Sequence, residues 1–486
     1  MFKAIHCSSV GISYRDANSF LDKLEALGTE IHALMIQRHG KTAIEGYWAP
    51  YAPGVIHGCQ SLSKTVTGIA LGAALHEGIL SLDELLVDIF PEYRHLTEGK
   101  PYWDELKVKH IATMSAGMDT QPSVVSPDWV EDFFKTDIHH KPGTAYMYHS
   151  IGCSMVGMCI RKRSGKGMMD YLGEKVLRKM GVDPDSLMWH KHANGLENGS
   201  GGFVSTVRVN ALLMELYRQG GVWQGERLLD ENWVKFALQV QNPHVGGEAL
   251  YGGMIWVRER CFVADGAMGQ WGMLFPKEDV VIAINQTISA PDVDNLVRNA
   301  VYDFVSSIRD EEVPWTPEEE RSFANRLSRL SIPQPVCQEN PAALKALCGR
   351  TLTVKDGNAH FFADDLNIFD LAYVNLVRSF RFEAAGGDMK VHLESEQGSA
   401  CCTVALRGYR PVCDVPPLGP NPVRTASVTG YFPDDHTLVM EVRWLESCRI
   451  HIVTIRWDEE GADMTTSRIP VGGFDVPDET ARAIWT

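Results

Sequence analysis

The sequence predicts an α+β protein (α/β in the broad sense): an antiparallel sheet with a helical lobe, followed by a second domain of antiparallel strands. Strand-like segments occur early, at residues 31–48, and again at 250–285, with a mostly helical stretch between them. This order indicates one sheet closed by distant parts of the chain. We expect a first domain over residues 1–330, with its helical lobe at about 81–240, and a β-rich domain over 340–486.

The first segments have clear periodicity and turn chemistry. Apolar positions predict a helix from Phe20 to Leu27. Two strands, Ile31–Arg38 and Thr42–Trp48, flank a His-Gly-Lys turn, which is typical of a β-hairpin. Further along, a capping box at Ser81 predicts a helix that ends at Phe90, before Pro91.

The sheet is expected to be completed by later strands. Strand character returns at residues 250–256, 261–264, 271–275 and 280–285, and a helix is expected from Asn295 to Val305. Thr316 is a predicted N-cap followed by Pro317 and acidic residues. Residues 331–335 are rich in proline and resemble a linker.

The C-terminal third consists of short β-type runs, at residues 351–354, 402–406, 437–444 and 449–457. The last two predict a hairpin. No structure is assigned to the stretch around Val377. An antiparallel β domain follows from these runs, and a small barrel is one arrangement that they allow.

Composition and charge exclude several classes of protein. A formal net charge of −16 argues against nucleic acid or an anionic membrane as the partner. No run of eighteen apolar residues is present, and the N-terminus lacks the apolar region of a signal peptide. Eleven scattered cysteines without a C-x-x-C pair suit a reduced, cytoplasmic protein.

Chemistry is indicated first by Ser61-Leu62-Ser63-Lys64. Its spacing places a hydroxyl and an ammonium one helical turn apart on the same face. The following residues, 65–75, are almost all apolar or small, which is typical of a buried helix. The alternative is an N-cap serine with a lysine that reaches the surface.

Two later segments are less specific on their own. Residues 141–152 form a Pro-Gly turn that leads to Tyr146, Tyr148 and Ser150; a buried structural tyrosine is the alternative here. Residues 262–270, with Asp265 and Gly266, follow a strand and could be an ordinary turn.

Together the three segments resemble the serine β-lactamase and penicillin-binding-protein superfamily, with its S-x-x-K, S-D-N and K-T-G elements. The closer likeness is to the branch of AmpC-type β-lactamases, D-amino-acid peptidases, β-lactamase-like carboxylesterases and 6-aminohexanoate-dimer hydrolase. In that branch the second element is commonly Tyr-x-Asn, and here it is Tyr148-His149-Ser150. Other matching stretches are residues 39–41, 77–83, 111–117 and 201–206. The resemblance covers about residues 10–310 and implies a β-lactamase-like catalytic domain.

The resemblance also implies roles for single residues. Ser61 would be the acylated nucleophile, and Lys64 and Tyr148 would share the general-base role, with Tyr148 later protonating the leaving group. The backbone N–H groups of Ser61 and Ala267 would form the oxyanion hole. It implies no cofactor and no metal.

Two departures from the family pattern bear on the substrate. Ser150 replaces the usual asparagine, which shortens a side chain that often touches the substrate amide. Ala264-Asp265-Gly266 replaces Lys-Thr-Gly or His-x-Gly, so a cation is lost and a carboxylate is expected near the pocket. We therefore expect an ester, a neutral amide or a substrate with a cationic end. Ser150, Asp265 and Gly266 are the predicted substrate-binding residues.

Two alternatives to a serine hydrolase remain open, and a third is disfavoured. An acyltransferase of the same fold would pass the acyl group to an alcohol or an amine, and a non-catalytic binding protein would keep the fold alone. A metal hydrolase is disfavoured, because His139-His140 and His190-Lys191-His192 lack further ligands at a suitable spacing. The β-rich domain offers no catalytic constellation; resembling hydrolases sometimes append β-barrels that cover the active site or mediate assembly. A homo-oligomer is left open.

Overall fold

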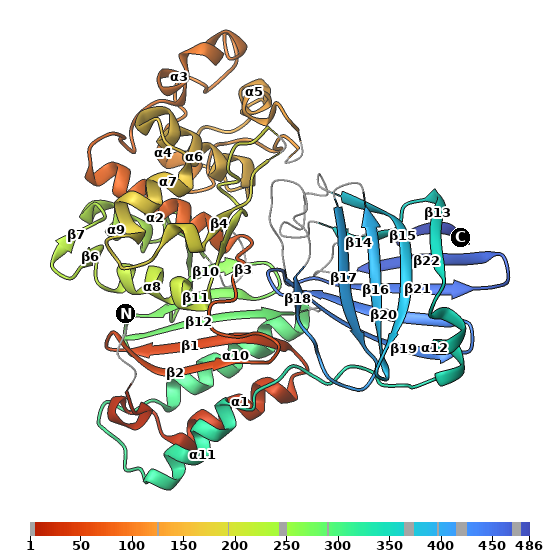
Figure 1. Cartoon of the computed structure of the whole chain (residues 1–486). Coiled ribbons are helices and arrows are strands. Elements are labelled where there is room, and N and C mark those ends of the chain that lie inside the picture. Colours follow the sequence, from red (N-terminus) through yellow and green to blue (C-terminus); the bar gives the residue numbers. More distant parts are fainter. Residues whose placement is uncertain are drawn as a thin grey trace.

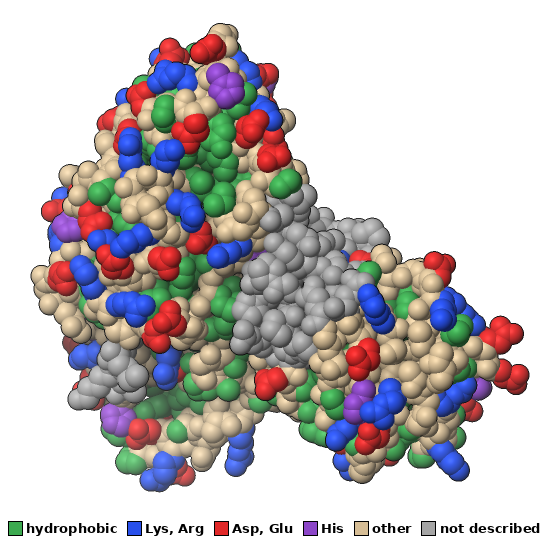
Figure 2. Space-filling model, turned by 45° about the horizontal axis from the view of Figure 1, so that its top comes forward, with side chains coloured by type: hydrophobic (Ala, Val, Ile, Leu, Met, Phe, Trp, Pro, Cys, Tyr) green, Lys and Arg blue, Asp and Glu red, His purple; other side chains and the backbone are tan. Residues whose placement is uncertain are grey.

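Figure 1 shows a computed structural model of the chain, in which two β-sheets lie side by side and helices cover the first one. The structure describes residues 5–123, 126–192, 194–242, 250–288, 291–363, 374–395, 398–414, 425–468 and 478–486. No helix in these ranges is long and apolar enough to cross a membrane. Acidic and basic side chains are interspersed over the face drawn in Figure 2.

The first sheet has seven strands in the order β2-β1-β12-β11-β10-β9-β8, and all of its pairings are antiparallel. The hairpin of β1 and β2 is confirmed, and β12 pairs with β1 from a distant part of the chain. Its strands are β1 (Glu30–Arg38), β2 (Lys41–Tyr47), β8 (Leu250–Tyr251), β9 (Trp256–Val257), β10 (Phe262–Gly266), β11 (Gln270–Phe275) and β12 (Val280–Thr287).

Both faces of this sheet are covered, so β11 and β12 are buried along their whole length. On one face Val263 and Trp271 belong to a core shared with α1 (Tyr14–Ala26) and α10 (Pro291–Ser307). On the other, Ala264 and Ala283 belong to a core shared with α2 (Leu62–His76) and α8 (Val207–Arg218). In Figure 1 α1, α10 and α11 (Pro317–Leu327) lie below the sheet and the helical lobe lies above it.

The helical lobe follows α2 and contains short helices joined by long loops. Its helices are α3 (Leu86–Ile89), α4 (Val108–Ala112), α5 (Trp129–Lys135), α6 (Ser150–Ser164), α7 (Met168–Leu172), α8 and α9 (Glu231–Ala237). The small strands here are β3 (His57–Gly58), β4 (Met188–Trp189), β5 (Phe203–Ser205), β6 (Val222–Trp223) and β7 (Glu226–Arg227).

The helix predicted from Ser81 to Phe90 is wrong in extent, because only α3 forms. The Ser81 hydroxyl accepts a hydrogen bond from the Asp83 N–H at 3.3 Å, which closes a local turn instead of a capping box. The backbone around residue 85 is engaged elsewhere: the Leu86 N–H donates to the Leu106 carbonyl. Tertiary pairing thus overrides the local helix signal.

The single strand predicted at residues 250–256 is also corrected, to the two short strands β8 and β9. A Cβ at Gly252 would lie 2.1 Å from the Ala237 carbonyl oxygen, so the backbones are in close contact there. The Gly253 N–H donates to the same carbonyl. The chain turns at these glycines because α9 packs directly against it.

The second sheet closes into a barrel, because β13 pairs with both β23 and β15. Its strands are antiparallel except for the parallel contact of β17 with β19. They are β13 (Thr351–Gly357), β14 (His360–Ala363), β15 (Val374–Ala385), β16 (Asp388–Ser395), β17 (Gly398–Ala405), β18 (Cys413–Asp414), β19 (Thr425–Asp434), β20 (Thr437–Trp444), β21 (Ile450–Trp457), β22 (Gly461–Arg468) and β23 (Glu479–Trp485); α12 (Pro341–Leu347) precedes them. The predicted β20–β21 hairpin is confirmed.

The stretch around Val377, to which the sequence assigned no structure, is β15. Its side chains at Val377, Phe380 and Phe382 are buried in the barrel core. The alternation shifts at a bulge between Val377 and Ser379, which hides the period of two. Of the linker predicted at residues 331–335, Ser331 forms an isolated β-bridge with Ala49, and residues 332–340 form no regular structure.

Candidate active site

Ser61 stands at the N-terminus of α2, at a sharp turn of the chain. Gln60, directly before it, has a φ of 51°, which a residue with a side chain adopts at a cost. The Ser61 hydroxyl makes no capping hydrogen bond to α2. The Ser61 hydroxyl therefore does not act as a simple helix N-cap.

Lys64 is the partner of that hydroxyl. Its Nζ donates to Ser61 Oγ at 3.0 Å and to the Ser200 carbonyl at 2.9 Å. The lysine is only 3% exposed, so the alternative of a surface lysine is wrong. A buried amine held against a serine hydroxyl is an arrangement that can move a proton from that hydroxyl.

The first turns of α2 are fastened to the loop before β5. The Phe203 N–H donates to Ser63 Oγ at 2.9 Å, and Thr67 Oγ1 donates to the Gly199 carbonyl at 2.7 Å. With the bond from Lys64 to Ser200, three side chains of one helix hold residues 199–203. This fixes the direction of the Lys64 side chain, since both ends of it are restrained.

Tyr148 lies across from the serine, just before α6. The Lys64 Nζ is 4.8 Å from the centroid of its ring, and the ring stacks on Trp256 with a centroid separation of 6.1 Å. Its side chain is 37% exposed. Its hydroxyl bonds to no other side chain or backbone group in the described ranges, so it is open to a bound molecule.

The turn after β10 brings backbone N–H groups next to the nucleophile. A Cβ on Gly266 would lie 2.2 Å from the Cys59 carbonyl oxygen, so only glycine allows β10 to approach the chain before Ser61 this closely. Ala267 follows at once. Neither the Ser61 N–H nor the Ala267 N–H donates to a carbonyl within the described residues. Two such donors are what an oxyanion hole requires.

Asp265 does not face this site, contrary to the expectation from the sequence. Its carboxylate accepts hydrogen bonds from Trp271 Nε1 at 3.0 Å and from Arg298 of α10 at 3.3 Å. Successive strand residues point to opposite faces, and it is Ala264 that faces α2. The predicted carboxylate near the substrate is therefore on the other face of the sheet, and a neutral methyl group takes its place.

Ser150 is the first residue of α6, and its side chain is 7% exposed. The cap of α6 is His149, whose Nδ1 accepts from the Gly152 N–H at 2.7 Å. Burial lowers the pKa of His149 to about 4, so the ring is neutral near pH 7 and can accept that bond. The pairing of Ser150 with a substrate stays a prediction.

Two contributors to the site were missed in the sequence. Ser200 acts through its carbonyl, which any residue could supply, so its identity carried no signal. Trp256 was treated only as part of a strand. The signal that could have indicated its role is an aromatic residue shortly after the glycine pair Gly252-Gly253, where a turn is expected. Tyr251 lies edge-on to Trp256 at 5.0 Å, so an aromatic wall backs Tyr148.

The histidine pairs considered as metal ligands do not gather. Among the described residues, no group of three histidine, cysteine, aspartate or glutamate side chains could hold a metal ion. His140 instead pairs with Asp119 at 2.9 Å, and His192 packs against Trp129.

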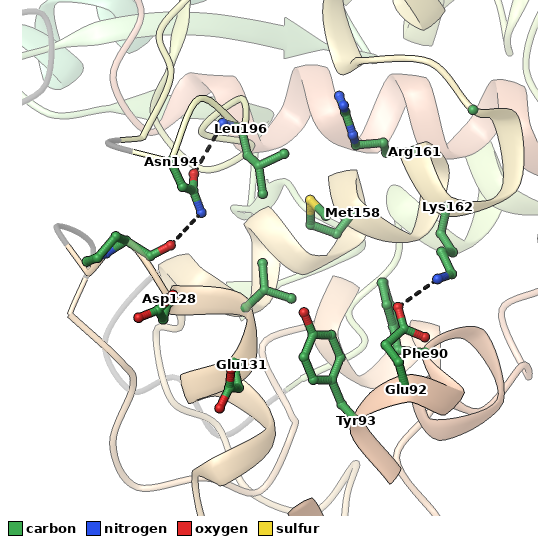
Figure 3. A pocket seen from close by; sticks show the side chains of 13 residues that line it. Phe90, Glu92, Tyr93, Asp128, Glu131, Met158, Arg161, Lys162, Asn194 and Leu196 are labelled. Carbon is green, nitrogen blue, oxygen red and sulfur yellow. Dashed lines mark hydrogen bonds and ion pairs between the residues drawn. The ribbon is translucent and has the colours of Figure 1, made fainter.

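A separate pocket of about 430 Å³ lies in the helical lobe (Figure 3). Tyr93 and Met158 point into it, and Lys162 at its rim pairs with Glu92 at 2.6 Å. None of its described lining residues is a serine, a cysteine or a histidine. It therefore lacks a nucleophile of its own, and the candidate active site remains at Ser61.

A family profile described as Beta-lactamase matches residues 28–305, more than half of the 486 residues. The chain therefore belongs to the Beta-lactamase family, and the resemblance in its motifs is confirmed. The matched range contains Ser61, Lys64, Tyr148 and Ala267 and every strand of the first sheet.

Two curated relatives and one solved structure are similar to the chain. The 6-aminohexanoate-dimer hydrolase of Paenarthrobacter ureafaciens is 23% identical over 224 residues, 42% of this chain and 56% of that protein. A Beta-lactamase of Yersinia enterocolitica is 26% identical over 160 residues, 31% of this chain and 40% of that protein. The chain thus spans about half the length of these relatives.

The crystal structure of SurE aligns with 96% of this chain and 99% of its own, with a TM-score of 0.50 and 15% identity. At that identity the likeness concerns the fold alone. It extends over both the first sheet with its helices and the barrel, which the family profile does not cover.

Proposed function

We propose that the protein hydrolyses an ester or an amide through an acyl-enzyme on Ser61. The observation that carries the proposal is the 3.0 Å contact between Lys64 Nζ and Ser61 Oγ, made by a lysine that is 3% exposed. A buried amine next to a hydroxyl at a helix N-terminus activates a serine without a histidine.

In the first half of the reaction, Ser61 Oγ attacks the substrate carbonyl, and Lys64 and Tyr148, which share the general-base role, take up its proton. The Ser61 and Ala267 N–H groups stabilise the oxyanion that forms. The C–O or C–N bond then breaks, and Tyr148 delivers the proton taken from Ser61 to the leaving group. Water attacks the acyl-enzyme in the second half and restores the Ser61 hydroxyl.

The side chains around Ser61 support a class of substrate. Within β10, Ala264 faces α2 where the family pattern has a cation, and the Asp265 carboxylate points to the α10 side. The wall of Tyr148 and Trp256 offers apolar contact beside the nucleophile. A neutral ester or amide with an apolar acyl group fits best, and the likeness to a 6-aminohexanoate-dimer hydrolase supports hydrolysis as the reaction.

We also propose a cytoplasmic location. All eleven cysteines are free thiols, and four of them are exposed or half-buried. A reducing compartment keeps such thiols in this form.

The test is the intact mass after incubation with a fluorophosphonate probe. One adduct on the parent enzyme, absent in Ser61→Ala and slowed in Lys64→Ala, supports the proposal. Lys162→Met is the control, since it removes a lysine at the separate pocket of the helical lobe and should label at the parent rate. Absence of an adduct on the parent would favour a binding protein that kept the fold.

A further inference from the structure

The turn between β20 and β21 of the barrel, residues 445–449, reaches back to the first sheet. The Gly58 N–H donates to the Glu446 carbonyl at 2.7 Å, three residues before Ser61. Thr287 Oγ1, at the end of β12, donates to the Cys448 carbonyl at 2.9 Å. Glu446 and Cys448 are 5% and 1% exposed, so this turn is an internal part of the molecule.

The Cys448 side chain touches the side chains of the residues next to the two candidate oxyanion-hole donors. Its Sγ lies 3.6 Å from Gln60 Nε2 and 3.1 Å from the Met268 sulfur. Gln60 directly precedes Ser61, and Met268 directly follows Ala267. One sulfur atom thus stands between the neighbours of the two N–H donors.

Gln60 and Met268 share an unusual backbone conformation, with φ values of 51° and 64°. Side chains disfavour this left-handed region, and such residues keep it only where their surroundings impose it. Gln60 directly precedes the peptide group that carries the Ser61 N–H, and Met268 closes the turn in which Ala267 stands. The contacts with Cys448 therefore hold the backbone on either side of the gap between the Ser61 and Ala267 N–H groups.

A second, buried connection runs from the barrel to the same segment. Arg443 of β20 pairs with Glu30, Glu30 with His32 Nε2 at 2.9 Å, and His32 Nδ1 with His57 Nε2 at 2.9 Å. His57 lies in β3, which leads into Ser61. The barrel thus contacts the segment before Ser61 in two places. One is the turn 445–449, and the other is Arg443, which reaches His57 through Glu30 and His32.

We propose that the 445–449 turn is a positioning element of the oxyanion hole, with Cys448 as its central residue, and that the barrel is in this way a part of the catalytic apparatus. The inference rests on the proposed function of Ser61. Cys448 does not touch the reacting atoms. It acts by holding Gln60 and Met268, so that two N–H groups from distant parts of the chain converge on one oxygen.

The test compares Cys448→Ala and Thr287→Val with the parent enzyme on an activated ester and on the matching thionoester. Cys448→Ala removes the sulfur contacts, and Thr287→Val removes one of the two hydrogen bonds described above between the turn and the first domain. We expect kcat for the ester to fall about tenfold in Cys448→Ala with KM within about twofold, because misplaced groups cost about 100-fold per ångström. Thr287→Val should show a smaller loss in the same direction.

The thionoester separates positioning from mere stability. Sulfur accepts hydrogen bonds from N–H groups poorly, so a working oxyanion hole favours the ester. The ester-to-thionoester ratio should therefore fall in both variants, together with the affinity for a boronic acid that forms a tetrahedral adduct on Ser61. Cys402→Ala, a buried cysteine of the barrel core, is the matched control and should keep the parent ratio.

The thermal unfolding midpoint shows whether each variant is folded. If both variants are folded and keep the ester-to-thionoester ratio of the parent enzyme, the inference is overturned. If the parent enzyme labels at Ser61 while the variants keep its kcat, the proposed function stands and the inference alone fails. If the parent enzyme neither labels nor turns over, it is the proposed function that fails.

Discussion

The two sides of the candidate active site are built in opposite ways. On the nucleophile side, Ser61 and the buried Lys64 are joined to each other and to Ser200 by hydrogen bonds. On the tyrosine side, Tyr148 is 37% exposed and held by ring contacts with Lys64 and Trp256. Under the proposed function, this difference means that the groups for proton removal from the serine are in place before the substrate binds, whereas the substrate completes the leaving-group side.

The largest effect is expected on the nucleophile side, from Lys64→Met. Methionine fills the space of the lysine but donates no hydrogen bond, either to Ser61 Oγ or to the Ser200 carbonyl. Loss of a general base costs about 10²–10⁴-fold, and we expect kcat/KM for an ester to fall by about 10³-fold. A loss below tenfold would mean that another group accepts the serine proton.

The tyrosine side should respond in a way that depends on the leaving group. Tyr148→Phe keeps the ring over Lys64 and on Trp256 and removes only the hydroxyl. For an amide, whose nitrogen must be protonated, we expect kcat to fall by about 10²-fold. A nitrophenyl ester needs no such proton, so its kcat should fall far less. Equal losses for the two substrates would assign Tyr148 to proton removal from Ser61 instead.

The tyrosine side also carries an acid-sensitive cap. Burial holds the pKa of His149 at about 4, below the value of 6.5 for a free histidine. As the pH falls below 6.5, the unfolded chain binds a proton that the folded protein does not, so stability is lost until about pH 4. His57, on the nucleophile side, has a pKa lowered to about 3, chiefly by burial, and adds a loss of the same sign.

His149→Asn removes one of these two contributions, because asparagine caps a helix without titrating. We expect the fall in unfolding free energy from pH 7.5 to pH 5 to shrink by about 2 kcal/mol. Urea unfolding at the two pH values measures it. An equal fall in parent and variant would show that the imidazole is protonated in the folded protein.

The sequence predicted the nucleophile side well and the geometry around it poorly. The Ser-x-x-Lys spacing and the apolar residues after it indicated both the contact and the burial, since each depends on a single helix. Cys448, by contrast, is 388 residues from Gln60, and only the folded barrel brings the two together. No local pattern could have indicated that contact.

The orientation of the Asp265 side chain could not be predicted from the sequence for a related reason. A strand buried on both faces has no alternation of polar and apolar residues to show which side chain faces which layer. The register that decides it is the pairing of Asp265 with Trp271 in β11. The bond to Arg298 joins β10 to a helix 33 residues further on. The identity of the residue was known, but its side of the sheet was not.

The smallest effect on catalysis is expected from Asp265→Asn, which tests that orientation. Since the carboxylate lies on the α10 side, the relative kcat/KM for acyl groups ending in a carboxylate, a methyl ester or an ammonium should not change. Stability should fall by about 1–2 kcal/mol, because a charged hydrogen bond to Arg298 becomes a neutral one. Asparagine keeps an acceptor for the Trp271 indole, and Asp294 still pairs with Arg298 at 2.8 Å, which limits the loss. A shift of preference toward the anionic substrate would place the Asp265 charge beside Ser61, and a neutral site would then no longer explain the choice of substrate.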